Sequence, residues 1–227
     1  MGTGWIVTVL QALQEAGIRA QRGFPAEKMP YLTGPVVGIS LDQLEEDSIT
    51  LSVRVYAPVS QGGPVCEDVA AQVLKVLNRL EAQCTVESGS FDGATGLFCV
   101  PVKAKYEKLG SASKIMVYIN KVQVPHLVSF SARYRCTYDR LKDLSTDRYY
   151  LSRQEYRWYL EIEDILEQGT MPCGREEPYT VYIVHSSGTW SFLYCFVEEL
   201  DVIPTPAGTR RIRKLVSCGN PVENIPM

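Results

Sequence analysis

The sequence predicts an α+β protein: an N-terminal antiparallel sheet with two helices on one face, followed by a mainly β domain that forms a sandwich or a barrel-like sheet. Three observations lead to this prediction. Two segments of the first half repeat apolar residues at helical spacing, the segments between them alternate apolar and polar residues, and beyond residue 113 this alternation is almost continuous. The small, polar run Lys108–Ser113 separates the two patterns, so we place the domains at 1–110 and 111–227.

The chain starts with an amphipathic helix, expected over Thr3–Ala16, and Gly17 supplies its stop. Its apolar residues, three or four positions apart, are Ile6, Val9, Leu10 and Leu13. The segment Ala20–Thr33 contains two prolines and a glycine, so we expect a loop that leads into a strand over Gly34–Leu41. Asp42–Asp47 has four acidic residues and is predicted to be a solvated turn.

The clearest strand of the first half is Ile49–Val55, where every second residue is apolar. Gly62, Gly63 and Pro64 then introduce a second amphipathic helix over Val65–Leu80, because proline suits the first helical turn. Two further strands are expected over Thr85–Ser88 and Phe98–Tyr106. The order helix, strand, strand, helix, strand, strand favours a largely antiparallel sheet.

The second half is a series of short alternating segments. We predict strands over Ile115–Ile119, 128–138, 156–163, Tyr179–His185, Thr189–Glu198 and Arg210–Ser217. Asn120–Lys121 is expected to be a turn, and the period of two in 156–163 favours a strand over a helix. The tail Asn220–Met227 holds two prolines and is predicted to be mobile.

Composition excludes several classes of protein. The formal net charge of −3 gives no electrostatic reason for nucleic-acid binding. The longest early apolar run, Trp5–Leu13, is too short to span a bilayer, and no basic segment precedes it, so neither a membrane anchor nor a signal peptide is expected. The seven cysteines are widely spaced without a CxxC pair, which favours reduced thiols over a disulfide framework or a zinc site.

No residue pattern indicates catalysis. The two histidines are His126 and His185, and His185 lies near Ser186, Ser187 and Ser191, but a GxSxG nucleophile motif is absent. The glycine-rich run Ser88–Gly96 lacks the lysine and the following helix of a phosphate-binding loop, and is better explained as a hairpin loop. Glu161, Glu163 and Asp164 are expected to form a solvated, ion-paired face. We therefore expect no enzyme activity, cofactor or metal, and keep a hydrolase that uses the His185 region as an alternative.

Three groups of residues are candidates for protein interfaces. The first is the glycine-rich turn with Gly89, Asp92 and Gly93. The second is an aromatic cluster, with Tyr156, Trp158 and Tyr159 as its centre, which alternatively makes the second domain a binding module for a peptide or a sugar. The third is the basic run that includes Arg210 and Arg211, expected at a solvated or subunit-contacting edge.

The first 108 residues resemble the tail-terminator (tail-completion) proteins of long-tailed bacteriophages and prophages. The resemblance is carried by Trp5–Ala16, Met29–Gly38, Ile49–Val55 and Val65–Leu80 after Gly62–Pro64. It implies an α+β subunit that assembles into a ring, usually of six copies, which caps the tail tube and offers a surface to the head. It brings no cofactor and no catalytic residue.

The same resemblance implies the partners and the location of the protein. Its partners are expected to be further copies of itself, the tail-tube protein and head–tail connector proteins, with no nucleic acid or membrane. It is expected in the bacterial cytoplasm during assembly and in the tail of the virion. Residues 111–227 exceed the usual terminator pattern and resemble, more faintly, β modules of phage tail and baseplate proteins, which leaves a different tail component as an alternative.

Overall fold

The computed structural model describes residues 4–24, 32–45, 47–93, 95–107, 115–142, 149–166, 178–185, 188–206, 208–219 and 221–224, and for 136–156 and 224 the backbone only. Its helices are α1 (Trp5–Glu15) and α2 (Gly62–Arg79). The strands of the first part are β1 (Ala20–Arg22), β2 (Val36–Glu45), β3 (Ser48–Pro58), β4 (Gln83–Val86), β5 (Ser90–Asp92) and β6 (Leu97–Glu107). Those of the second part are β7 (Met116–Ile119), β8 (Val122–Gln123), β9 (Leu127–Lys142), β10 (Tyr149–Leu166), β11 (Tyr179–His185), β12 (Gly188–Thr205), β13 (Gly208–Ser217) and β14 (Val222–Asn224).

All of these strands belong to one hydrogen-bonded sheet. Its path is β4-β6-β3-β2-β9-β10-β13-β12-β11-β7-β8, and β5, β1 and β14 pair with β6, β2 and β12. Every pairing is antiparallel except that of β1 with β2. The fold is thus mostly antiparallel β-sheet with two helices, and the strands of the second part continue the sheet of the first.

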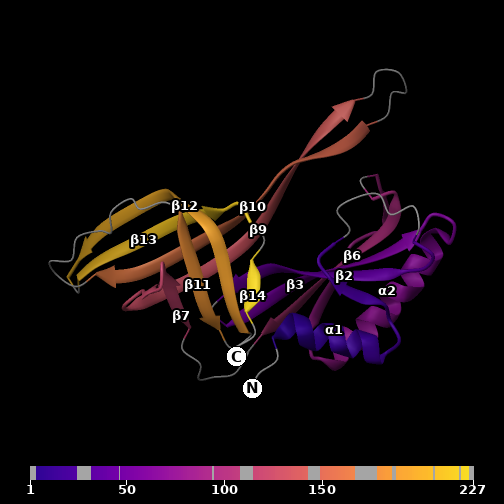
Figure 1. Ribbon diagram of the computed structural model, residues 1–227, viewed down its shortest axis with the longest axis horizontal. Helices are drawn as coiled ribbons and strands as arrows, with labels where there is room; N and C mark the ends of the chain where they lie inside the picture. The colour runs from indigo at the N-terminus through magenta and orange to yellow at the C-terminus, as the bar shows by residue number, and fades with distance from the viewer. Residues whose placement is uncertain are drawn as a thin grey trace.

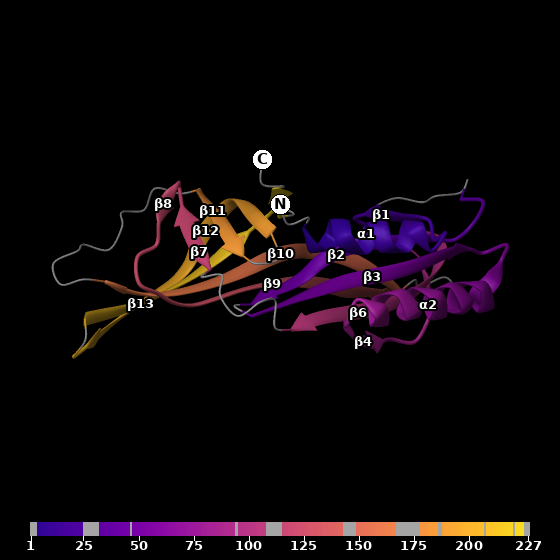
Figure 2. The same ribbon diagram turned by 90° about the horizontal axis from the view of Figure 1, so that it is seen from below.

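The core of the first part follows from the alternation of β3. Ile49, Leu51, Val53 and Val55 are completely buried, and they share one apolar cluster with the inward residues of both helices. Those helical residues are Ile6, Val9 and Leu13 of α1 and Cys66, Ala70, Val73, Val76 and Leu77 of α2. Figure 2 shows α1 beside β1 and β2, and α2 beside β6. Each fully buried Val or Leu contributes about 1.5–3 kcal/mol, so the helices are held mainly by this packing.

The core of the second part is aromatic. Trp158 of β10 is 1% exposed and meets Phe192 of β12 edge to face, with ring centroids 5.4 Å apart. The long strand β12 pairs with two other strands of this core, with β11 through its first half and with β13 through its second half. Its register shifts between these halves, and Tyr194 at the shift has φ +52°. The bulge lets one strand bend across the aromatic core.

Two contacts join the two parts. Gln43–Glu45 at the end of β2 pair with Ser131–Arg133 of β9. At the other side, Glu223 of β14 lies at the start of α1, where Gly4 leaves room for its carboxylate, and Arg22 donates to its Oε2 at 2.9 Å. A Cβ on Gly4 would lie 1.8 Å from Oε1 of Glu223. The apolar cluster is continuous through both parts, so they fold around a common core.

One hairpin extends beyond the common core. Past Arg135 and Arg157, strands β9 and β10 pair only with each other among the described residues, because the pairing of β10 with β13 begins at Trp158. Figure 1 shows this part of the hairpin rising away from the rest of the molecule. We call the residues 136–142 and 149–156 the β9–β10 arm.

Several predicted elements differ from the structure. The turn predicted at Asp42–Asp47 starts too early, because β2 continues to Glu45, where it ends beside β9, and β3 starts at Ser48. The expected loop Ala20–Thr33 contains the short strand β1, and the tail predicted to be mobile contains β14. The predicted domain boundary, Lys108–Ser113, lies outside the described residues. The turn predicted at Asn120–Lys121 is confirmed: both residues have positive φ, +48° and +69°, as a two-residue hairpin turn requires.

Gly38 gives a first test of the packing. A Cβ there would lie 2.5 Å from the carbonyl oxygen of Gly23 and 2.8 Å from the ring of Phe24. Because backbone cannot move aside cheaply, we expect Gly38→Ala to destabilise the protein by about 1–3 kcal/mol in urea unfolding. Gly34→Ala, which places its Cβ in open space, is the matched control and should leave the midpoint unchanged. Equal midpoints for the two variants would contradict this account of the β1–β2 contact.

Glu223 gives a second test, through pH. Burial raises the pKa of its carboxyl above the ordinary 4.5, while Arg22 and the N–H of Ile6 oppose the shift. A raised pKa means that the stability contributed by the protonated form is complete below about pH 4.5 and is lost as pH rises through the higher, folded-state pKa. We therefore expect the stability of the wild type, relative to Glu223→Gln, to fall across this window. Urea unfolding of both proteins between pH 4 and 8 measures the difference; a flat difference would show that the carboxylate is not penalised by burial.

Candidate functional site

The two histidines lie in different surroundings in this fold. His185 is buried at the end of β11 and lines neither of two cavities in the described part, the first between the β7–β8 turn and strands β12 and β13, the second, of about 460 Å³, beside β7 and the start of β9. Of the serines near it, Ser191 is buried in β12, and Ser186 and Ser187 lie outside the described residues. His126 is exposed in the connection between β8 and β9 and borders the second cavity.

Burial raises the pKa of four described thiols, those of Cys66, Cys84, Cys99 and Cys195. Cys66, Cys84, Cys99, Cys195 and Cys218 are free. Burial raises the pKa of Cys99 to about 12 and that of Cys195 to about 11, so both stay protonated near neutral pH. The described residues contain no group of three or more His, Cys, Asp or Glu side chains placed to bind a metal.

The glycine-rich run forms an exposed edge. Residues 85–91 are all exposed, and Gly93 lies in the turn that joins β5 to β6. Asp92 accepts a hydrogen bond from Thr95 Oγ1 at 2.9 Å. A Cβ on Gly89 would lie 3.0 Å from Val100 and 3.9 Å from Oε1 of Glu67, so this glycine lets the edge lie close to β6 and to the start of α2. The run follows a strand pattern and is not placed ahead of a helix, unlike a phosphate-binding loop.

The predicted aromatic cluster is divided between the two faces of the sheet. Trp158 lies in the core against Tyr134 and Phe192, so it offers no open groove to a ligand. Tyr159 lies on the opposite face, where the guanidinium of Arg135 stacks 5.0 Å from the centre of its ring. The side chain of Tyr156 lies outside the described part of the structure.

The basic run is divided in the same way, because successive residues of β13 alternate between faces. Arg210 is exposed and donates to Oε1 of Glu163 at 2.6 Å. Arg211 is 4% exposed and binds Asp164 through two parallel hydrogen bonds, of 3.1 Å to Oδ1 and 2.6 Å to Oδ2. Arg213 donates to Oδ1 of Asp164 at 3.1 Å. The expectation of a solvated or subunit-contacting edge is therefore wrong for Arg211 and Arg213, and the solvated face predicted for Asp164 is wrong as well, since its side chain is fully buried.

A cavity of about 430 Å³ opens beside this buried ion cluster. It lies between the β7–β8 turn and strands β12 and β13, and its walls are mainly apolar. Arg211 and Arg213 contribute the charged part of the lining; the apolar part comes from Ile119, Val122, Val124, Pro125, Val197, Leu200 and Leu215. The volume is in the range of small ligand pockets.

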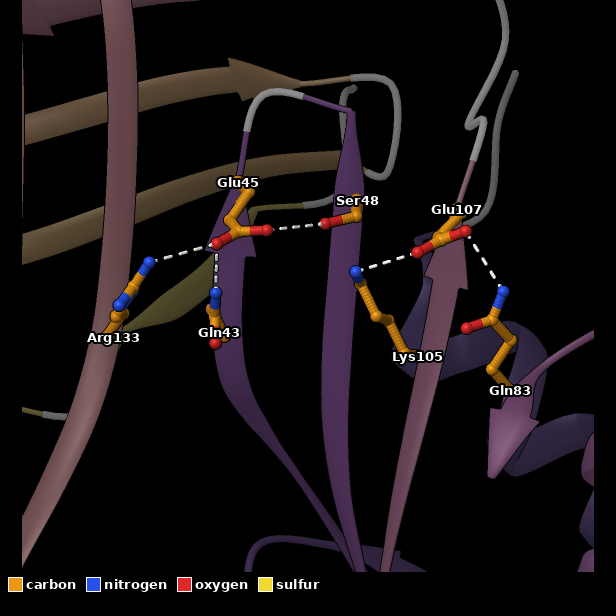
Figure 3. Close-up of polar contacts among 7 residues, drawn as sticks. All are labelled: Gln43, Glu45, Ser48, Gln83, Lys105, Glu107 and Arg133. Carbon is orange, nitrogen blue, oxygen red and sulfur yellow. Dashed lines mark hydrogen bonds and ion pairs between the residues drawn. The ribbon is translucent and has the colours of Figure 1, made fainter. Parts of the chain in front are cut away.

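A polar cluster surrounds the junction of β2 and β9, as Figure 3 shows. Glu45 accepts hydrogen bonds from Gln43, from Ser48 Oγ at 3.1 Å and from Arg133 at 3.2 Å. Glu107 makes a parallel group at the end of β6, with Lys105 at 2.8 Å and Gln83 at 3.0 Å. These side chains are largely exposed, so the cluster orients the junction more than it stabilises it.

The strongest surface feature is an apolar strip on β12 that sequence periodicity did not indicate. Of the twelve large hydrophobic residues that are exposed in the described part, six lie on this strand: Leu193, Tyr194, Phe196, Leu200, Val202 and Ile203. We call these six the β12 strip. Tyr194 is 63% exposed although its left-handed backbone costs about 1 kcal/mol. The bulge thus presents an aromatic ring to solvent at a conformational cost.

No known protein family and no curated protein matches this sequence. Neither of the helices in the described residues is long and apolar enough to cross a membrane. The function therefore has to be inferred from the structure itself. Its main features are a buried ion cluster, a small cavity, and exposed apolar side chains that are concentrated on one strand.

The buried ion cluster gives a third test. Asp164→Asn leaves Arg211 and Arg213 without the carboxylate that fixes them, so we expect a loss of about 3–5 kcal/mol in urea unfolding. Glu163→Gln removes the neighbouring pair with Arg210, whose guanidinium lies in solvent, and should leave stability close to that of the wild type. If Asp164→Asn unfolded at the same urea concentration as Glu163→Gln, the cluster would not be part of the core.

Proposed function

We propose that the protein is a structural subunit that works by docking against copies of itself and against other proteins of a phage or prophage tail. The observation that carries this proposal is the β12 strip. Half of the large exposed hydrophobic residues of the described part lie on this one strand, divided between its two faces, and such a concentration of exposed apolar side chains is typical of a segment that is covered in an assembly. The strained backbone at Tyr194 supports the same reading, because strain at an exposed aromatic residue is best explained by a contact that uses the ring.

The β9–β10 arm supports docking independently. A two-stranded ribbon is marginally stable in water, so an arm of this length is expected to lie against a partner. Its sequence contains Tyr138, Tyr149, Tyr150 and Tyr156, and tyrosine is enriched in protein interfaces.

Within this class, the tail terminator remains the specific proposal. Its support is the resemblance of residues 1–108, together with the order of α1, β2, β3, α2, β4 and β6 along the chain. On this proposal copies close into a ring, six being the usual number, that caps the tail tube and contacts the head–tail connector. The protein acts in the bacterial cytoplasm during assembly and stays in the virion tail. It makes and breaks no covalent bonds, and residues 115–224 serve as an added docking module.

A second candidate function is a binding module, which the cavity beside Arg211 and Arg213 favours. An apolar segment of a partner peptide would fill the cavity and use the guanidinium groups for orientation. This site is distinct from the groove expected at Tyr156, Trp158 and Tyr159. Filling the cavity with Val122→Trp, at a lining residue outside the β12 strip, would weaken peptide binding but leave assembly unchanged if the two functions are separate.

Analytical ultracentrifugation tests the structural function. We expect the wild type to associate at high concentration, or on addition of the tail-tube protein of the same phage or prophage. Phe196→Asp places a charge within the β12 strip and should shift the population toward monomer by at least about ten-fold in dissociation constant. Val59→Asp, at an exposed apolar residue outside the strip, is the control and should associate like the wild type. A wild type that stays monomeric both alone and with tube protein would refute the proposal.

A further inference from the structure

The first helix has no cap of its own. Its N-cap is Gly4, which has no side chain to accept a hydrogen bond, and its first turn contains no acidic residue. The N–H groups at the start of a helix lack partners within the helix and favour a negative charge. The carboxyl group of Glu223 lies at this position: a Cβ on Gly4 would be 1.8 Å from its Oε1, and the N–H of Ile6 acts to lower the pKa of the carboxyl. Strand β14 therefore supplies the acidic group that α1 lacks.

Strand β14 is short, and its attachment centres on this one side chain. Its three residues pair with Thr189–Ser191 at the edge of β12. Val222 is 48% exposed and so buries little apolar area, whereas the side chain of Glu223 is buried and accepts from Arg22 at 2.9 Å. Arg22 is itself partly exposed. The position of the strand therefore depends on three residues of backbone pairing and on how well the buried carboxyl group is accommodated.

The hydrogen bonding of this carboxyl group is incomplete. Arg22 donates to Oε2 of Glu223, but Oε1 has no hydrogen-bond partner. A buried acceptor without a donor is unfavourable, and more so when it carries charge. In water both oxygens are solvated. The ionised form of Glu223 is therefore less favourable in the buried position than in water, and burial raises the pKa of its carboxyl.

Two side chains of the neighbouring elements carry or can acquire charge. Arg22 on β1 stays protonated at every pH at which the protein is folded. His185 lies at the end of β11, which pairs with the same part of β12. The first turn of α1, Trp5–Thr8, and residues Thr189–Ser191 of β12 contain no ionisable side chain. A comparison with Glu223→Gln separates the response of Glu223 from that of His185, because His185 is present in both proteins.

We propose that β14 is a latch that opens as the pH rises, so that this strand leaves β12 and the start of α1 while the rest of the sheet stays folded. Well below pH 4.5, the ordinary pKa of Glu, the carboxyl is protonated whether the latch is closed or open, and the closed latch is at its most stable. As the pH rises toward the higher pKa of the closed latch, the open form loses its proton first and is favoured. The open latch leaves the edge of β12 unpaired, and an unpaired edge can accept another extended strand. This latch does not depend on the proposed function.

Amide hydrogen exchange tests the latch, because it measures local opening. Its reporters are the amides of Val222–Asn224 and that of Thr8, which donates to the carbonyl of Gly4 at 3.0 Å. We expect their protection to be lost progressively between about pH 4 and pH 8, after correction for the intrinsic pH dependence of exchange. Protection of Ile49–Val55 in the core should stay constant. In Glu223→Gln, whose amide cannot ionise, protection of the reporters should not vary with pH.

Two further variants make the test specific. Glu87→Gln changes an exposed carboxylate between β4 and β5 and should respond to pH like the wild type. Gly4→Ala places a Cβ against Oε1 of Glu223 and should leave β14 unprotected at every pH. Protection of β14 in Gly4→Ala as strong as in the wild type overturns the proposal, and so does constant protection of the wild type across the pH range. An equal loss in Glu223→Gln assigns the response to His185 and overturns it too. A loss that extends to β3 does the same, because it shows unfolding of the whole sheet.

Discussion

The backbone pairing between the end of β2 and the middle of β9 is the constraint on which the arrangement of this protein depends. Three residue pairs, 43–45 with 131–133, merge two sets of strands into one sheet and bring their apolar residues into one core. The pairing also fixes where β9 leaves the first part, and therefore where the β9–β10 arm starts.

Two buried ionic contacts hold this arrangement in place, and each has a cost. Asp164 lies fully buried between Arg211 and Arg213, and Glu223 is buried against Arg22 at the start of α1. Buried ion pairs contribute less to stability than the attraction between their charges suggests, because desolvating the charges is costly, but they disfavour registers in which a partner is missing. A shift of β13 by one residue would turn Arg211 and Arg213 to solvent and leave Asp164 alone in the core. These contacts thus select one register.

Local periodicity predicted the elements that one buried face defines. It failed where the end of a strand or the burial of a side chain depends on a strand that is distant in the sequence. The alternation of Ile49–Val55 and of Tyr179–His185 predicted β3 and β11, because one face of each is buried. Alternation along β13 also predicts that Arg210 and Arg211 point to opposite faces of the sheet. Only the position of Asp164 on β10, however, determines which of the two is buried. The acids of Asp42–Glu45 suggested a turn, but β9 supplies both a backbone partner and Arg133 for Glu45. The bulge at Tyr194 has no local signal of its own, so the β12 strip could not be predicted.

The proposed docking function accounts for two surface features that are unfavourable in a single chain. A single chain leaves the β12 strip in water and presents the arm as a ribbon with no third strand among the described residues. Each feature costs free energy in isolation, and each becomes favourable when a neighbour supplies apolar area or a further strand.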